Sequence, residues 1–303
     1  MKSSFESLRE ERFGMDAKRS KLNRTSAGTV TSYRPLQGRA KQVASCQKAA
    51  SCQKAASASR ERLALVIPAL REAENLYPLL RRVRDVLDSA SIAWEVIVVD
   101  DESGDGTEEI VSAISREEPR VRLLVRRGER GLSGAILHGW RHTDATILGA
   151  MDADGQHPAE LLPALIEAVV SGRDLAIGSR YAKGGRCGWN PVRRLVSMAA
   201  ILAARPLQSV WPSVRDPLSG FFLVRRPCVE KMFFQTAGFK LLLEILVRGR
   251  IRSVEEIPFV FGRRRAGRSK VTARVAWDYI TLLVRLYTAR FAGARVAEPV
   301  SGD

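Results

Sequence analysis

The sequence contains no apolar run long enough to cross a membrane. A spanning helix needs about 18 or more largely apolar residues, whereas the two longest candidates, residues 195–204 and 279–287, are short or interrupted by charge. The first thirty residues are polar and charged and lack the apolar core of a secretory signal. We therefore expect a cytoplasmic chain that does not span a bilayer unaided.

Cysteine is also scarce. The 303 residues contain four cysteines, Cys46, Cys52, Cys187 and Cys228. Their spacing matches neither a Cys-x-x-Cys pair nor a zinc-ligand pattern, which argues against a disulfide scaffold and a structural zinc site. We expect the protein to work in a reducing compartment.

Positive charge is in excess and unevenly distributed. The chain has 49 Lys and Arg against 33 Asp and Glu, a net charge of +16, and residues 1–60 hold 13 of the former and 4 of the latter. This segment is rich in Ser, Ala, Lys and Arg and repeats one hexapeptide at 44–49 and 50–55. Because such a composition buries too little apolar surface to order itself, we predict a disordered basic tail over 1–60.

The remaining sequence alternates between strand and helix patterns. Continuous apolar runs predict buried strands, and apolar residues at helical spacing predict the helices between them. The predicted strands are 63–68, 94–100, 121–125, 146–151 and 174–178, and the predicted helices are 76–89, 107–115, 134–143 and 158–170. This alternation predicts an α/β fold with a mostly parallel sheet, helices on both faces, and ligands at the carboxyl ends of the strands.

The pattern changes after Tyr181. Here we predict an apolar helix, two further strands, a short helix and a final amphipathic helix. Their predicted ranges are 192–210, 221–224, 240–248, 253–261 and 273–291, of which the second and fourth are the strands. We expect this half to form the acceptor side of a site.

Two carboxylates, Asp152 and Asp154, follow a predicted buried strand. Alternate residues of a strand point the same way, so the pair suits one hard divalent cation. Mg²⁺ or Mn²⁺ commonly bridges carboxylates to substrate phosphates, as a departing nucleoside diphosphate requires. Gln156 could orient a metal ligand, whereas we expect the lone His157 to be structural. A solvated acidic turn is the alternative that two carboxylates alone leave open.

The acidic segment 100–107 ends another predicted strand. Its carboxylates and hydroxyls could hydrogen-bond a nucleoside base and ribose. The alternative is an ordinary turn in which Asp105 or Thr107 caps the next helix, and both interpretations can hold together.

Fixed positive charge is available at Arg180, at Arg193 and Arg194, and in the run 262–270. The planar guanidinium of arginine suits phosphate oxygens, although a basic loop can also be solvated or lie against anionic lipid or nucleic acid. No helix-turn-helix, zinc-finger or RNP signature is present, so nucleic acid is not expected as a partner.

Taken in order, these motifs resemble the polyprenyl-phosphate mannosyltransferases, or dolichol-phosphate mannose synthases, of glycosyltransferase family 2. The likeness runs from about Leu63 to about Tyr287 and rests on segments 66–75, 99–107, 131–135, 151–158, 178–185, 216–222, 238–240 and the basic loop ending at Lys270. It implies a GT-A type domain over 61–272, followed by an amphipathic C-terminal helix and tail over 273–303.

The resemblance also implies roles for individual residues. The residues implied for the nucleoside are Pro68, Glu72 and Asp101, and those for the diphosphate and its Mg²⁺ or Mn²⁺ are Asp152, Asp154 and Gln156. The residues implied for donor and acceptor phosphates are Arg180, Arg194 and Arg264. Ser219 and Gly220 would lie near the sugar, and Ser269 and Lys270 would belong to a loop closing over the donor.

Four residues depart from the family pattern. Leu70 and Arg71 stand where the family usually has a Tyr-Asn pair that it often uses against the nucleobase, so the donor base stays open. Arg268 replaces a common acidic residue. Gly155 replaces the usual Leu after Asp152-Ala153-Asp154, the acidic triplet. No implied ligand is lost.

The resemblance implies transfer of a sugar, with mannose from GDP-mannose as the leading donor, to a polyprenyl or dolichyl phosphate with inversion. The phosphate acceptor is already anionic, so the site needs alignment and charge neutralisation rather than a strong base. The alternatives are a polyprenyl-phosphate glucosyltransferase that uses another nucleotide-sugar and a non-catalytic basic protein that binds membrane or nucleic acid. The intact acidic triplet argues against the latter.

The resemblance further implies action at the cytosolic face of a membrane. We expect the helices 192–210 and 273–291 to lie on the bilayer surface, with ordinary core packing as the alternative. The chain resembles short family members that act peripherally or with a separate membrane-anchoring subunit.

Overall fold

The computed structural model describes residues 61–189, 191–209, 213–234, 240–262 and 273–291. The predicted basic tail and the C-terminal residues 292–303 lie outside these ranges. So do Arg264, Ser269 and Lys270 of the basic loop. The roles implied for them stay predictions.

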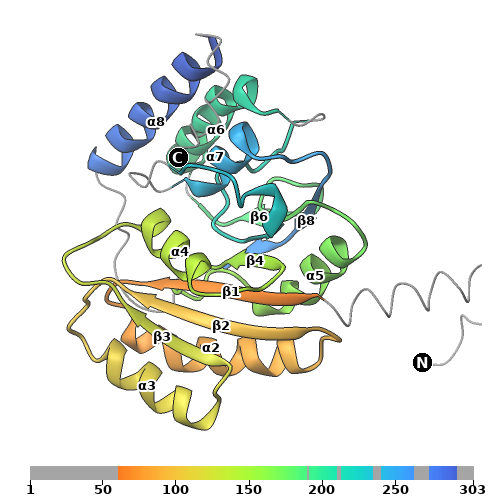
Figure 1. The fold of residues 1–303 in the computed structure, drawn as a ribbon. Helices are drawn as coiled ribbons and strands as arrows, with labels where there is room; N and C mark the ends of the chain where they lie inside the picture. Colours follow the sequence, from red (N-terminus) through yellow and green to blue (C-terminus); the bar gives the residue numbers. More distant parts are fainter. Residues whose placement is uncertain (1–60, 190, 210–212, 235–239, 263–272, 292–303) are drawn as a thin grey trace, which may run out of the picture. The chain divides into compact units, whose positions relative to one another are not determined.

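Seven strands form one sheet in the order β3-β2-β1-β4-β7-β5-β8 (Figure 1). All neighbours pair in parallel except β7, which is antiparallel to both β4 and β5. The strands are β1 Arg62–Ala69, β2 Ala93–Asp100, β3 Val121–Val125, β4 Ile147–Ala150, β5 Leu175–Ser179, β7 Phe222–Arg225 and β8 Val254–Pro258. The predicted mostly parallel sheet is confirmed.

The prediction of one strand over 253–261 is wrong. β8 ends at Pro258, and β9, Val260–Phe261, pairs instead with β6, Arg186–Cys187, in a separate small sheet. Proline has no N–H to continue a strand ladder, and the N–H of the next residue, Phe259, donates to the oxygen of Ser179 at the end of β5. The oxygen of Phe259 accepts from the N–H of Arg186 in β6, so the chain passes from the main sheet to the small one at this residue.

Helices cover both faces of the sheet because successive side chains of each strand point to opposite sides. Leu63, Leu65 and Ile67 of β1 face a core formed with α2, α3 and α5, whereas Ala64 and Val66 face a core formed with α4 and α7. The helices are α2 Ala73–Asp88, α3 Thr107–Glu117, α4 Leu132–Arg141, α5 Leu162–Val170 and α7 Leu241–Arg248, with a 3-10 turn, η1 Ala159–Leu161, before α5.

Two more helices, α6 Pro191–Ala204 and α8 Ala273–Phe291, form a third cluster with α7 (Figure 1). Leu282 and Leu286 of α8 are buried in it, and the hydroxyl of Tyr279 donates to the oxygen of Ala200 at 2.6 Å. The predicted helix over 192–210 is too long, since Pro206 follows α6 in a 3-10 turn, Arg205–Leu207. No helix in the described ranges is both long and apolar enough to span a membrane.

We expect Leu282→Ala to loosen α8 from the α6–α7 pair. A buried Leu→Ala change costs about 2–5 kcal/mol through lost burial and the cavity left behind, and α8 has few other buried contacts to offset it. Hydrogen exchange of the α8 amides should accelerate in this variant. The matched control is Val284→Ala in the same helix, because Val284 is exposed; equal exchange in both variants would contradict the packing described.

Candidate active site

The predicted ligand residues meet at one edge of the sheet. β1 pairs in parallel with β2 and β4, with Ala69 opposite Asp100 and Val66 opposite Ala150. The carboxyl ends of these strands therefore open onto the same side, where parallel sheets bind ligands. The acidic segments 100–105 and 152–154 both start there.

The acidic triplet is placed by a turn and not by strand alternation. β4 ends at Ala150, and Ala153 and Asp154 lie in a turn, so the argument that an extended strand points both carboxylates the same way does not apply. Asp154 is buried and its Oδ1 accepts from the N–H of Gln156 at 3.0 Å. Gly155 has a left-handed φ of 70°, a conformation that glycine adopts more readily than leucine.

Asp152 lies directly against Gly220. A Cβ atom at Gly220 would stand 2.6 Å from Oδ2 and 2.9 Å from Oδ1 of Asp152, so only glycine lets the chain entering β7 approach this carboxylate. The side chain of Asp152 keeps 32% of its surface exposed. The structure thus brings Gly220, implied for the sugar, next to a residue implied for the metal.

The donor atoms fit a hard divalent cation that is shared with a substrate. Asp152 and Asp154 offer carboxylate oxygens, and the side-chain Nε2 of Gln156 donates to the oxygen of Gly262 at 3.0 Å, which leaves Oε1 as its acceptor atom. In the described part of the chain, no group of three or more His, Cys, Asp or Glu could hold a metal ion by itself. Mg²⁺ characteristically takes one or two carboxylates and completes its shell with phosphate and water.

Gln156 also connects the triplet to the basic loop. The N–H of Gly262 donates to the backbone oxygen of Gln156 at 3.0 Å, in addition to the side-chain bond in the other direction. Gly262 is the last described residue before 263–272. The start of the loop is therefore fixed beside the acidic triplet.

His157 is held in an aromatic setting. Its ring lies between Phe221, Phe259 and Phe261, at centroid distances of 5.3, 5.7 and 5.6 Å. Burial lowers the pKa of His157 to about 4, so the ring is neutral at pH 7. Its Nδ1 stands 3.8 Å from Oδ2 of Asp152. His157 packs behind the acidic triplet and supplies no positive charge there.

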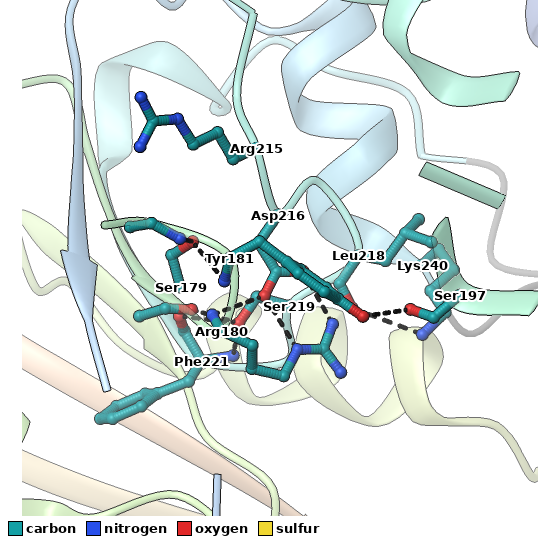
Figure 2. Close-up of polar contacts among 12 residues, drawn as sticks. Ser179, Arg180, Tyr181, Ser197, Arg215, Asp216, Leu218, Ser219, Phe221 and Lys240 are labelled. Atoms are coloured by element: carbon teal, nitrogen blue, oxygen red, sulfur yellow. Dashed lines mark hydrogen bonds and ion pairs between the residues drawn. The ribbon is translucent and has the colours of Figure 1, made fainter. Parts of the chain in front are cut away.

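Arg180 forms a buried ion pair with Asp216 (Figure 2). Nε and Nη2 of Arg180 donate to the two carboxylate oxygens at 2.8 and 2.7 Å, and the backbone N–H of Arg180 donates as well, at 2.9 Å. Asp216 is 0% exposed and Arg180 9%. Burial disfavours the charge of Arg180, but the bonds to Asp216 outweigh it and raise the pKa of the guanidinium.

Glu256 of β8 binds the backbone of the turn that contains Asp216. Its two carboxylate oxygens accept from the backbone N–H groups of Arg215 and Asp216, at 2.9 and 3.0 Å. The hydroxyl of Ser219 donates to the oxygen of Gly178 at 2.7 Å. Ser219 therefore anchors the turn to β5, and Gly220 is presented to Asp152 from a fixed position.

Asp101 also forms a buried ion pair, with Arg126. Nε and Nη2 of Arg126 donate to its two carboxylate oxygens, each at 2.8 Å, and the N–H of Gly131 donates to Oδ2 at 2.8 Å. Both side chains are buried. Asp101 thus shapes the loop before α4, and its predicted contact with a nucleoside stays a prediction.

These contacts describe an edge where Gly220 lies against one of two carboxylates and buried arginine–carboxylate pairs flank them. A profile of the family described as "Glycosyl transferase family 2" matches residues 64–233. This chain belongs to glycosyl transferase family 2.

Relatives of this glycosyltransferase confirm the resemblance to polyprenyl-phosphate mannosyltransferases. A dolichol-phosphate mannosyltransferase of Pyrococcus furiosus is 39% identical over 226 residues, which are 74% of this chain and 63% of that protein. The chain thus spans less than two thirds of that relative. The dolichol-phosphate mannosyltransferase of Mycosarcoma maydis is 39% identical over 243 residues, 75% of this chain and 80% of that protein.

A solved structure confirms the fold of the glycosyltransferase. Glucosyl-3-phosphoglycerate synthase from Mycobacterium tuberculosis, in complex with Mn²⁺, UDP-glucose and phosphoglyceric acid, matches with a TM-score of 0.59. The match covers 79% of this chain and 82% of that one at 19% sequence identity. At this identity the likeness concerns the α/β fold of GT-A type alone.

The remaining site residues of the glycosyltransferase are spread more widely. Glu72 is buried at the start of α2, where its Oε2 accepts from the side chain of Asn75 at 2.7 Å, and Pro68 lies within β1. Arg194 is exposed on α6, whereas its neighbour Arg193 stacks on Trp189, 4.3 Å from the ring centroid.

Arg71 takes an unusual backbone conformation beside the acidic segment 100–105. Its φ is 56°, a left-handed value that asparagine, the usual residue of the family here, tolerates better than arginine. The N–H of Arg71 donates to the hydroxyl of Ser103 at 2.8 Å, and the N–H of Ser103 donates to Asp100 at 2.9 Å. The two loops at the carboxyl ends of β1 and β2 are therefore joined.

Two functional candidates escaped the sequence patterns. Asp216 was named only as the first residue of the segment 216–222, without a role, and Arg126 was not singled out at all. A charged residue next to apolar sequence was the available signal in both cases, but its partner lies 36 residues away for Asp216 and 25 for Arg126.

We expect Asp216→Asn to destabilise the protein by about 3–5 kcal/mol, because it leaves the buried charge of Arg180 without a counter-charge. Urea denaturation measures the change. The matched control is Asp88→Asn, which removes a pair with Arg120 at 2.8 Å in which both side chains are about half exposed. Exposed pairs contribute about 0–1 kcal/mol, so equal losses in the two variants would count against the buried pair.

Proposed function

We propose that this protein transfers mannose from GDP-mannose to a polyprenyl phosphate. The observation that carries the proposal is its 39% identity to dolichol-phosphate mannosyltransferases over three quarters of the chain. The placement of Asp152 and Asp154 at the carboxyl edge of the sheet supports it, as does a similarly folded enzyme from Mycobacterium tuberculosis with Mn²⁺ and a nucleotide-sugar.

In this proposal an oxygen of the lipid phosphate attacks the anomeric carbon of the sugar. The bond from that carbon to the diphosphate oxygen breaks, the diphosphate leaves with the electron pair, and the configuration inverts. A phosphate monoester is anionic at neutral pH, so no proton has to be removed from the nucleophile. This agrees with the setting of His157, which is buried and neutral.

The protein's own residues align the reactants and offset their mutual repulsion. Asp152, Asp154 and Gln156 would hold Mg²⁺ or Mn²⁺, which supplies neutralisation of the leaving diphosphate. Gly220 leaves the carboxylate of Asp152 accessible from the sugar side. Positive charge from Arg180, Arg194 and Arg264 would face the phosphates, with Arg180 oriented by Asp216.

The experiment that tests the proposed function is a donor panel. Radiolabelled GDP-mannose, UDP-glucose and other nucleotide-sugars are each incubated with a polyprenyl phosphate and Mg²⁺ or Mn²⁺, and label in the lipid phase is counted. We expect transfer from GDP-mannose, abolished by a chelator. Asp154→Asn should lower it by roughly 100-fold or more because a ligand for the leaving group is lost.

Asp144→Asn is the matched control, since Asp144 is exposed and lies outside the site. Transfer from UDP-glucose alone would favour the polyprenyl-phosphate glucosyltransferase. Unchanged turnover in Asp154→Asn would refute the role of the acidic triplet, and absence of transfer from every donor would favour a non-catalytic binding protein.

We propose further that the protein acts at the surface of a membrane. α6 exposes Val192, Leu195, Val196 and Leu202, and Val192 and Leu195 keep 71% and 70% of their surface exposed. Leu195 and Val196 lie three and four residues after Val192. Leu202 lies seven residues after Leu195, so the four side chains share one face of the helix. Arg193 and Arg194 are exposed beside it. Apolar side chains flanked by arginine suit the headgroup region of an anionic bilayer.

α8 adds to this surface in the proposal. Trp277, Ile280 and Val284 are exposed along α8, whose opposite face packs on α6 and α7. Tryptophan is favoured at the interface between headgroups and acyl chains. The two helices would thus bring the lipid phosphate to the site while the protein stays on the bilayer.

Flotation with phosphatidylcholine vesicles containing phosphatidylserine tests this surface. The wild type should float, and the double variant Leu195→Glu/Val196→Glu should float several-fold less, because two carboxylates would enter the apolar layer. Tyr77→Glu is the control. Tyr77 is exposed on α2, a helix that packs in a different core cluster from α6 and α8. Wild type that stays unbound would favour a separate membrane-anchoring subunit.

A further inference from the structure

Lys240 is a cation beside the site that has no role in the proposed mechanism. It directly precedes α7, and its Nζ lies near the turn that contains Asp216 and Ser219 (Figure 2). Among the described residues, the one hydrogen bond of its Nζ goes to the oxygen of Leu218, at a long 3.4 Å. None of the ion pairs found within the described ranges includes Lys240.

The charges around Lys240 belong to the site. Burial and then the charge of Arg180 lower the pKa of Lys240, while Asp152 and Asp216 act in the opposite direction. Asp216 is already neutralised by the two-point contact with Arg180. Asp152 is the residue implied for the metal. Lys240 therefore interacts electrostatically with Asp152 of the acidic triplet and with both members of the Arg180–Asp216 pair.

A structural role alone does not explain a lysine at this position. An ammonium group has three donors, and the contact with Leu218 uses one of them. A neutral amide would make the same hydrogen bond without the free-energy cost of withdrawing a charge from water. A cation that is partly desolvated, and near a carboxylate already paired with Arg180, is suited to an anion that arrives from outside.

We propose that Lys240 binds a phosphate group of a substrate, as a point charge beside the oriented guanidinium of Arg180. The inference rests on the proposed function and adds a residue that binds a phosphate of one of its substrates. The phosphate belongs either to the diphosphate of the donor or to the lipid acceptor. Because Arg180 is held by Asp216, Lys240 is the cation of this cluster that can turn toward an oxygen without breaking an ion pair.

The test compares Lys240→Met with wild type. Methionine is of similar length and carries no charge. A charge-assisted hydrogen bond to phosphate corresponds to roughly 10- to 100-fold in binding or rate, so kcat/KM should fall by about that factor. Binding of GDP with Mg²⁺ is measured by calorimetry, and KM for a polyprenyl phosphate is measured at saturating GDP-mannose.

Weaker GDP binding would assign Lys240 to the donor diphosphate, and a raised KM for the polyprenyl phosphate would assign it to the acceptor. Either result supports the inference. GDP binding, KM and kcat all within twofold of wild type would overturn it. A fall in kcat with both binding measures unchanged would also overturn it, because the lysine would then not bind a ground-state phosphate.

Lys240→Arg and Lys231→Met complete the design. Lys240→Arg keeps the charge and should retain more activity than Lys240→Met, whereas a purely structural role would not distinguish them by charge. Lys231 is exposed on the surface and serves as the matched control. If thermal denaturation shows that Lys240→Met is not folded, it is replaced by Lys240→Gln, which keeps a hydrogen-bond donor for the oxygen of Leu218. Failure of the wild type to transfer any sugar would refute the proposed function, whereas the calorimetric comparison with GDP would still test Lys240.

Discussion

The buried pair of Arg180 and Asp216 is the interaction on which the site end of strands β5, β7 and β8 depends. It joins the residue that follows β5 to the turn that enters β7, and Glu256 ties the same turn to β8. Three strands are thus fixed at their site ends by polar bonds within an apolar surrounding. Burying two charges carries a high desolvation cost, which this geometry offsets through bonds to both carboxylate oxygens. The arrangement gives the site a defined shape more than it gives the fold extra stability.

A second buried arginine–carboxylate pair lies at the carboxyl end of β2. Arg126 holds Asp101 and, through Gly131, the start of α4, so each half of the site has one buried arginine clamped by one carboxylate. The acidic triplet lies between them with less support, and Asp152 is partly open to solvent. Rigid flanks around one buried and one partly exposed carboxylate suit a site for two anionic substrates, since alignment has to overcome their repulsion.

Local patterns predicted most of the fold. β3 and α8 have the predicted bounds, and the bounds of the central strands differ from the predicted ones by one or two residues. These elements are predictable because the apolar pattern of a buried strand or an amphipathic helix lies within one continuous stretch of sequence. The exceptions depend on distant partners. α2 begins at Ala73, three residues before the predicted start, where the N–H of Ala73 donates to Asp105. The break between β8 and β9 likewise depends on pairing with β6.

The candidate site was predicted as a set of residues and not as an arrangement. The sequence places Asp152 and Gly220 in separate motifs, and their contact follows only from the sheet order. Arg180 was recognised as a cation for phosphate, but its carboxylate partner was not, since nothing in a linear pattern says which of many acidic residues a buried arginine meets.

The reversed direction of β7 has a consequence for how such a site can change. In an all-parallel sheet, the segments that precede strands open onto the far edge. Because β7 runs against β4 and β5, the segment leading into it, 213–221, arrives at the same rim as the segments leaving its neighbours. This rim of the sheet can therefore be changed by exchanging one inbound connection, while strands β1 to β4, which precede it in the chain, keep their own sequence.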